Sequence, residues 1–305
     1  MLSAHHISQW YGPKQVLSDL TFSVDKGEIV GFLGPNGAGK STTMKILTGY
    51  MLPTTGEVTI HNKKMSEEAT ELKALIGYLP ENNPLYTDFT VEETLLFHAD
   101  MRGLKGRKKI TALRKAVERC GLEEVFYSSI QSLSKGYRQR VGLSTAIIHE
   151  PKILILDEPT SGLDPRQIIE IRDLLQTLGK DHTILFSTHI MQEVQAICQR
   201  VLIINKGKLV AEGSPASLGG KKGETTIHIT STLSPEDCVN ELESQYKVIG
   251  AKRQHDKTTE ITLKIEDGVE ARQVLLRELL DKNIPVLSFI PQEQNLEEIF
   301  LELTT

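Results

Sequence analysis

The sequence is poor in cysteine and has no long apolar run. Its 305 residues contain three cysteines, Cys120, Cys198 and Cys238, which are too scattered for a disulfide framework or a metal-binding motif. No apolar stretch approaches the length of a membrane-spanning helix, and the first residues lack the basic-then-apolar order of a signal peptide. These absences favour a protein of the reducing cytoplasm. If it serves a membrane process, we expect a separate chain to span the membrane.

An excess of positive charge is also missing. The formal net charge of −5 argues against a protein that coats nucleic acid. The short basic cluster at residues 105–109 is interpreted as the solvated start of a helix. With 39% hydrophobic and 25% charged residues, the composition is that of an ordinary globular protein. The length favours one large domain followed by a small one.

A glycine-rich stretch near the N-terminus has the Gly-x-x-x-x-Gly-Lys-Ser spacing of a phosphate-binding loop. It consists of Gly34, Pro35, Asn36, Gly37, Ala38, Gly39, Lys40 and Ser41. A predicted buried strand at 28–33 precedes it, and a predicted helix over 41–47 follows it. An ordinary glycine-rich turn is the alternative, but both flanks fit the phosphate loop.

The chemistry of such a loop assigns roles to its residues. The glycines let backbone N–H groups approach phosphate oxygens, and the start of the helix adds its unpaired N–H groups. We expect Lys40 to reach the β- and γ-phosphates of a nucleotide and the Ser41 hydroxyl to bind Mg²⁺. Thr42 is expected to contact the nucleotide nearer the α-phosphate.

Two further predicted strands end in polar residues. The apolar run 152–156 is closed by Asp157 and Glu158, and the strand 183–188 ends at His189. A run that is apolar throughout is typical of a strand buried on both faces, in a sheet with helices on each side. Ligands of such α/β sheets bind at the carboxyl ends of the strands. A solvated strand end is the alternative for the two carboxylates.

The remaining pattern predicts three regions. Residues 1–215 contain the phosphate loop, with strands at 2–8, 16–24, 54–60 and 76–80 and a helical part at about 88–150. Thr90 and Glu93 form a capping-box pattern there, and a helix over 108–120 is ended by Gly121. Residues 216–223 have the composition of a linker. Residues 224–305 show the order βαββαβ of a ferredoxin-like unit, followed by a short helix over 295–303.

Together these motifs resemble an ATP-hydrolysing subunit of an ABC transporter, over about residues 2–215. The resemblance rests on the phosphate loop, on residues 133–137, on Asp157-Glu158, on residues 161–164 and on His189. Residues 77–81 and 133–140 are similar to those of the multidrug and gliding-motility-associated export branch. The resemblance implies a P-loop α/β fold with an antiparallel N-terminal part and a helical part, joined to a small α+β domain.

The resemblance implies a nucleotide site for ATP and Mg²⁺. Asp157 is expected to hold Mg²⁺ together with Ser41. Glu158 is expected to orient and deprotonate the water that attacks the γ-phosphate, and His189 to contact that phosphate.

The resemblance also implies that a second subunit completes the site. Ser134 and the Gly136 N–H are expected to contact the γ-phosphate held by the other chain, and Asp164 to bridge the dimer. By its residues alone, Ser134 is a helix cap. Tyr11, which precedes a turn, is expected to stack on the adenine ring.

Two positions depart from the family's usual pattern. The signature following Ser134 is Lys135-Gly136-Tyr137 in place of the usual residues, although Ser134 and Gly136 are kept. Glu81 stands where the family usually has glutamine. Glu81 is therefore a candidate metal ligand, a candidate coupling residue toward a membrane partner, or a solvated loop glutamate.

The sequence thus predicts the ATP-hydrolysing subunit of an ABC exporter. We expect it to work as a homodimer on a separate transmembrane permease, on the inner face of the cell membrane, without binding nucleic acid. An alternative is an ABC ATPase that acts on DNA or ribosomes, but such proteins usually join two ATPase domains or contain a long coiled coil. Another is a regulatory module that binds ATP without turnover, and intact Lys40, Asp157, Glu158 and His189 argue against it.

Overall fold

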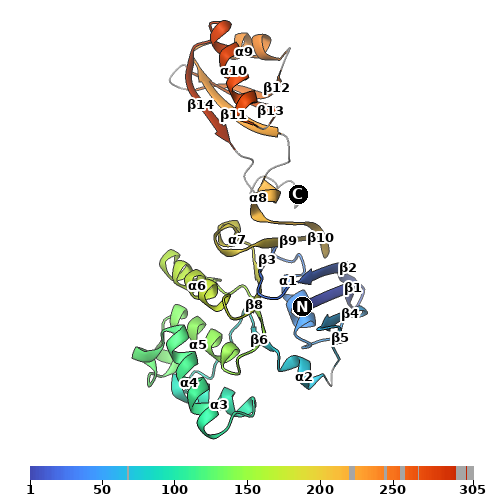
Figure 1. Ribbon diagram of the computed structural model, residues 1–305, viewed down its shortest axis with the longest axis vertical. Coiled ribbons are helices and arrows are strands. Elements are labelled where there is room, and N and C mark those ends of the chain that lie inside the picture. The colour runs from blue at the N-terminus through green and yellow to red at the C-terminus, as the bar shows by residue number, and fades with distance from the viewer. Residues whose placement is uncertain are drawn as a thin grey trace. The chain divides into compact units, whose positions relative to one another are not determined.

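The computed structural model describes residues 1–66, 69–219, 224–243, 246–254, 258–266, 268–292 and 300 (Figure 1). The chain divides into two units, with the boundary between Ser214 and Pro215.

A six-stranded sheet forms the centre of the N-terminal unit, in the order β10-β9-β3-β8-β7-β6. Its strands are β3 (Ile29–Leu33), β6 (Ile76–Leu79), β7 (Ile153–Asp157), β8 (Thr183–Thr188), β9 (Arg200–Asn205) and β10 (Lys208–Gly213). All pairs are parallel except β9 with β10, which form an antiparallel hairpin. Every residue of β3, β7 and β8 is buried, which the sequence predicted for β3 and β7.

A second, antiparallel sheet is built largely from the N-terminal residues, in the order β2-β1-β4-β5. Its strands are β1 (Leu2–Tyr11), β2 (Lys14–Val24), β4 (Thr55–Ile60) and β5 (Lys63–Lys64). This is the antiparallel N-terminal part that the sequence led us to expect.

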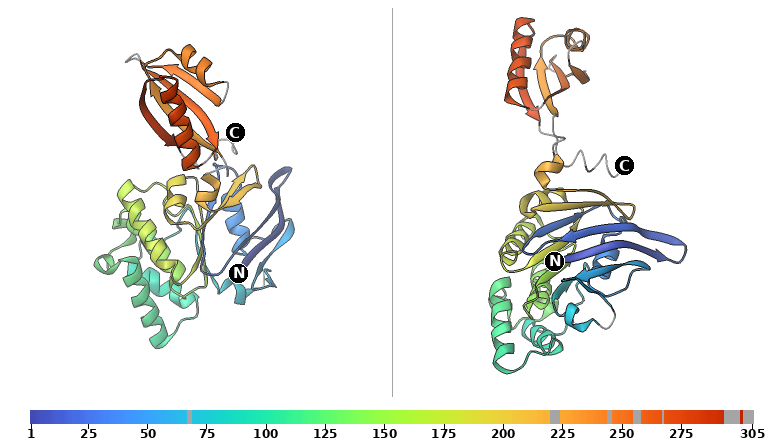
Figure 2. Two further views of the ribbon diagram at one scale, coloured as in Figure 1. Left: turned by 45° about the horizontal axis from the view of Figure 1, so that its top comes forward. Right: turned by 45° about the vertical axis from the view of Figure 1, so that its right-hand side comes forward.

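Helices complete the N-terminal unit. They are α1 (Lys40–Leu47), α2 (Thr70–Lys73), α3 (Val91–Met101), α4 (Gly106–Cys120), α5 (Lys135–Ile147), α6 (Pro165–Leu178) and α7 (Met191–Ile197). Helices α3, α4 and α5 gather at one end of this unit, away from the antiparallel sheet (Figures 1 and 2). The capping box of Thr90 and Glu93 begins α3, and Gly121 ends α4 in the left-handed conformation, both as predicted. Among the described residues, no helix is long and apolar enough to cross a membrane.

Two apolar cores lie on opposite faces of the central sheet. Alternate residues of β7 contribute to them: Ile153 and Ile155 join the core with α1 and the antiparallel sheet, while Leu154 and Leu156 join the core with the helices α3 to α6. Because successive side chains of a strand point to opposite faces, a strand that feeds two cores must be apolar throughout. Because β7 is buried on both faces, its position is fixed, and so is that of Asp157 at its end and of Glu158 directly after it.

The C-terminal unit begins with a short helix, α8 (Pro215–Gly219), inside the stretch predicted to be a linker. Proline is well tolerated in the first turn of a helix, which allows one to begin there. The unit continues with β11 (Glu224–Ser231), α9 (Pro235–Leu242), β12 (Lys247–Arg253), β13 (Thr259–Glu266), α10 (Val269–Asp281) and β14 (Val286–Gln292). These strands form an antiparallel sheet in the order β12-β13-β11-β14, which confirms the ferredoxin-like prediction. Of the helix predicted over 295–303, only residue 300 lies within the described residues.

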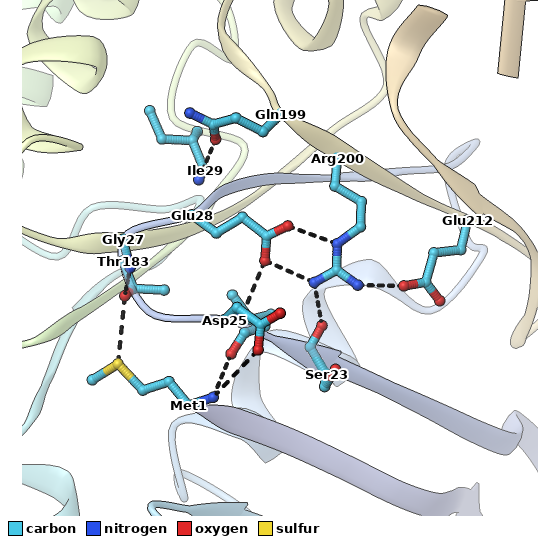
Figure 3. A network of polar contacts seen from close by, with 11 residues as sticks. Met1, Ser23, Asp25, Gly27, Glu28, Ile29, Thr183, Gln199, Arg200 and Glu212 are labelled. Atoms are coloured by element: carbon cyan, nitrogen blue, oxygen red, sulfur yellow. Dashed lines mark hydrogen bonds and ion pairs between the residues drawn. The ribbon is translucent and has the colours of Figure 1, made fainter. Parts of the chain in front are cut away.

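An arginine-centred network ties the last strands of the central sheet to the segment before β3 (Figure 3). Arg200 donates from Nε and Nη2 to the two carboxylate oxygens of Glu28, each at 2.7 Å, and also donates to Glu212 and to the Ser23 carbonyl. Burial alone would raise the pKa of Glu28, but the hydrogen bonds from Arg200 and from the Asp25 N–H hold it below its usual value. The paired carboxylate therefore favours the folded state.

Glu28→Gln tests this network through its pH dependence. The stabilisation by Glu28 is complete above the pKa of the unfolded chain, near 4.5, and is lost as the pH falls through the lower folded value. We expect the variant to lose about 1 kcal/mol at pH 7, because part of the charge-assisted bonding is screened by solvent. The difference from the wild type should shrink below about pH 4 in thermal unfolding scans. An equal difference at both pH values would exclude an ionised Glu28 as its source.

Candidate functional site

The phosphate loop connects β3 to α1, and its last glycine has a conformation that other residues rarely adopt. Gly39 lies at φ 109° and directly precedes α1. A Cβ atom at this position would lie 2.5 Å from Leu17 Cδ2. The glycine thus lets the loop turn into the helix while β2 packs against it, and the first N–H groups of α1 stay available for an anion.

Lys40 is buried, and its ammonium is held by the loop itself. Its Nζ donates to the carbonyl oxygens of Gly34, at 2.8 Å, and of Pro35, at 3.2 Å. It also lies 3.1 Å from Glu158 Oε1. Phosphate oxygens and the carboxylate of Glu158 therefore compete for the same ammonium group.

Glu158 is fixed at both its backbone and its side chain. It has a left-handed backbone, with φ 48°, directly after β7. The Glu158 N–H donates to Ser187 Oγ, at 2.9 Å, and to the Ser187 carbonyl, at 3.2 Å. Its Oε2 lies 2.7 Å from His189 Nδ1, so that the carboxylate lies between Lys40 and His189. Strain of this kind is typical of functional positions, where the surrounding contacts hold it.

Asp157, the last residue of β7, is 2% exposed and has one oxygen left for a further ligand. Its Oδ1 accepts a hydrogen bond of 2.6 Å from Ser187 Oγ, and within the described parts of the chain nothing pairs with Oδ2. Burial raises the pKa of Tyr78, and the nearby Asp157 carboxylate raises it further, so that Tyr78 stays a neutral phenol.

The side-chain oxygens of Asp157 and Ser41 fit Mg²⁺ only as part of a nucleotide complex. The described residues contain no group of three or more His, Cys, Asp or Glu side chains that could hold a metal ion. Mg²⁺ is usually bound by one or two protein oxygens together with substrate phosphates and water. The free oxygen of Asp157 and the half-buried Ser41 suit that arrangement.

A cavity of about 670 Å³ opens beside the phosphate loop. It brings together most of the predicted residues: Asn36, Gly37, Gly39, Lys40, Ser41, Thr42, Glu81, Glu158 and His189. The exposed Glu81 lies at its wall, which suits each of the three interpretations of that residue.

Four lining residues have no signal in the sequence motifs, Lys14, Gln15, Val16 and Lys206, whereas a fifth, Ser161, belongs to the motif 161–164. The first three come from β2, and Lys206 comes from the turn between β9 and β10. That turn is held to the loop because the Gly207 N–H donates to the Ala38 carbonyl at 3.0 Å. Such contacts join segments far apart in the sequence, so no local pattern could have indicated them.

Tyr11, the predicted adenine-stacking residue, is not among the residues that line this cavity. It lies at the end of β1, with a side chain that is 48% exposed, and its hydroxyl donates to Met51 Sδ at 3.3 Å. Its role in adenine binding stays a prediction.

The residues expected to act on the other subunit's nucleotide gather elsewhere. Ser134, Gly136 and Asp164 line a second cavity, of about 440 Å³, that shares no lining residue with the first. Ser134 caps α5, and Asp164 caps α6 in a capping box with Gln167. A Cβ on Gly136 would lie 2.9 Å from the Gln167 side chain, so that glycine permits the close approach of α5 and α6.

Comparison with known families agrees with this geometry. Residues 17–161 match the ABC transporter family, and residues 213–304 match the C-terminal domain of DrrA1-3-like ATP-binding proteins.

Two relatives span nearly the whole chain. The linearmycin resistance ATP-binding protein LnrL of Bacillus subtilis (strain 168) is 33% identical over 311 residues, covering 100% of this chain and 98% of that protein. The Nod factor export ATP-binding protein I of Burkholderia orbicola (strain AU 1054) is 32% identical over 300 residues, covering 98% and 95%. The solved dimeric structure of the bacterial ABC transporter cassette MJ0796 is 25% identical, with a TM-score of 0.64, and the match covers 70% of this chain and 98% of that one.

The fold and the site thus define a P-loop ATPase of the ABC type. The chain belongs to the ABC transporter family, as an ATP-binding protein with a DrrA-like C-terminal domain, and its relatives include multidrug and export ATP-binding proteins. It binds and hydrolyses ATP. The multidrug and export part of the predicted branch is confirmed, whereas the association with gliding motility stays a prediction.

Lys40→Ala tests the phosphate loop. Loss of a charge-assisted contact with the phosphates should weaken ATP binding on the order of 100-fold, as measured by calorimetry. Lys45→Ala is the matched control, since it removes a lysine from the same helix without altering the cavity lining. Equal nucleotide affinities of Lys40→Ala and Lys45→Ala would overturn the assignment.

Proposed function

We propose that this chain is the ATP-hydrolysing subunit of an ABC exporter, and that it works as a homodimer on a separate transmembrane permease at the cytoplasmic face of the membrane. ABC transporter ATP-binding subunits act as dimers with a membrane permease, and the related cassette MJ0796 was solved as a dimer. The names of the two relatives described above refer to resistance and to export, so we do not favour an action on nucleic acid or ribosomes.

The proposal of a dimer rests on the separation of the two cavities. Lys40 and Glu158 line one, while Ser134 and Gly136 line the other, and the two share no residue. We infer that the second cavity of each chain faces the nucleotide of its partner. ATP then joins the two chains, and its hydrolysis removes the phosphate that holds them together.

The proposed reaction begins with an exchange of partners at Lys40. When ATP binds, the Lys40 ammonium turns from Glu158 Oε1 to the phosphates. The freed oxygen accepts the proton of the water that attacks the γ-phosphate in line, while His189 holds Oε2. Bound Mg²⁺, held by Ser41 and Asp157, would neutralise phosphate charge.

We infer that contact with the permease is made near Glu81. Tyr86, Phe89 and Phe97 form an aromatic cluster, with Tyr86 58% exposed and Phe97 37% exposed. Exposed aromatic clusters are typical of protein interfaces. The loop between Glu81 and this cluster is tied to α5, because Asn83 Nδ2 donates to the Arg138 carbonyl at 2.8 Å. Helix α5 begins directly after Ser134, which lines the second cavity. A displacement of the loop by the permease would therefore be transmitted through α5 to that cavity.

We assign ATP chemistry to residues 1–215 and propose that 216–223 connect them to an accessory domain, residues 224–305, that contacts partners or stabilises the dimer. All the residues lining the two cavities lie before residue 215.

Glu158→Gln should bind ATP and yet nearly stop turnover, because an amide cannot accept the proton of the attacking water. Loss of a general base lowers the rate on the order of 10²–10⁴-fold. The variant should accumulate as an ATP-bound dimer in size-exclusion light scattering. Glu118→Gln, an exposed change on α4, is the control and should behave as the wild type. Turnover by Glu158→Gln at the wild-type rate would remove Glu158 from this role.

Glu81→Gln separates coupling from metal binding. We expect it to leave the basal ATPase rate of the isolated chain within about twofold, since a carboxylate both attracts Mg²⁺ and repels the triphosphate. It should alter the stimulation of ATPase activity by a reconstituted permease. If the isolated chain instead loses its Mg²⁺ dependence or most of its basal rate, Glu81 belongs with the metal ligands.

A further inference from the structure

A buried glutamate behind the nucleotide cavity has no role in the mechanism above. Glu193 lies in α7 and is 1% exposed. Thr188 Oγ1 donates to its Oε2 at 2.6 Å, and Thr160 Oγ1 donates to its Oε1. Within the described residues, no lysine, arginine or histidine pairs with it. Burying an uncompensated carboxylate is unfavourable, so a packing role alone gives no reason for this residue.

The two threonines belong to the two segments that carry the reacting groups. Thr160 follows Glu158 in the turn closed by the Ser161 N–H, which donates to the Glu158 carbonyl at 3.0 Å. Thr188 is the last residue of β8 and directly precedes His189. Its carbonyl also accepts from the Gly34 N–H, at 3.3 Å.

The sheet cannot hold these segments together by itself. The pairing of β7 with β8 ends at Asp157 and Ser187, one residue before Glu158. Beyond that pair, the Ser187 contacts hold only the backbone of Glu158. The Glu193 carboxylate is the hydrogen-bond acceptor that both loops share, with one oxygen for each threonine.

We propose that Glu193 is a positioning residue for ATP hydrolysis. By fixing Thr160 and Thr188, it keeps Glu158 Oε2 and His189 Nδ1 at their spacing of 2.7 Å. It does not line the nucleotide cavity, so we expect it to act without touching ATP. The inference rests on the roles proposed above for Glu158 and His189.

Three variants of the full-length chain test this bridge. Glu193→Gln keeps the size of the side chain but leaves one acceptor oxygen, while Thr160→Val and Thr188→Val each remove one donor. A small misplacement of reacting groups lowers rates strongly, so we expect kcat to fall on the order of tenfold or more in each variant. The KM for ATP should stay within about twofold, because the contacts of Lys40 with its loop are unchanged. Combining the two threonine changes should lower kcat by less than the product of the two single effects, as expected for residues that act as one unit.

Thr94→Val is the matched control. Thr94 is also buried, and its hydroxyl donates to the Thr90 carbonyl at 2.8 Å, in α3 and outside the cavity. This variant should lower Tm as much as the threonine variants at the site, with kcat unchanged.

A fall in Tm with kcat within twofold of the wild type, for all three site variants, would show that Glu193 serves only stability. A raised KM at constant kcat would overturn the proposal as well, because it would place the effect on the phosphate loop. If Glu193→Gln does not fold, the kcat of the two threonine variants decides between a positioning role and a role in stability alone. An active Glu158→Gln would instead refute the proposed base, so the two failures are distinguishable.

Discussion

The buried contact between Lys40 and Glu158 is the interaction on which the rest of the site depends. A lysine and a glutamate shielded from water must each be paired, and here each satisfies the other. Their meeting requires that the phosphate loop and the end of β7 lie side by side. The sheet order meets this need, because β8 alone separates β3 from β7 and carries His189 at its own end. Three residues far apart in the sequence thus meet at one edge of a parallel sheet.

Much of this arrangement can be predicted from the sequence. The apolar run before Asp157 indicates a strand buried on both faces, because one strand has to serve two cores. The glycine spacing before Lys40 indicates the turn, since Gly39 adopts a backbone conformation that side chains disfavour. Capping patterns at Thr90 and Ser134 place the starts of α3 and α5 closely, because the cap is a local hydrogen bond.

What the sequence could not predict depends on contacts between distant segments. Lys206 reaches the cavity only because the turn after β9 packs on the phosphate loop, and nothing near residue 206 encodes that contact. Glu193 resembles any polar residue of an amphipathic helix until the fold buries it between two threonines. The linker prediction covered α8 because glycine, serine and proline are typical of a linker, while proline is also well tolerated in the first turn of a helix.

The pairing of β11 with β14 has a consequence for how the C-terminal unit relates to the chain. Thr226 lies opposite Gln292 in this antiparallel pair, so the chain enters and leaves the sheet at one corner. Neighbouring strands are about 4.8 Å apart, so the start of β11 and the end of β14 lie close together. A module whose two ends adjoin can be exchanged between proteins without a change in the path of the remaining chain. Diversification of partners could therefore proceed by replacing this module, while the ATP-hydrolysing machinery stays as it is.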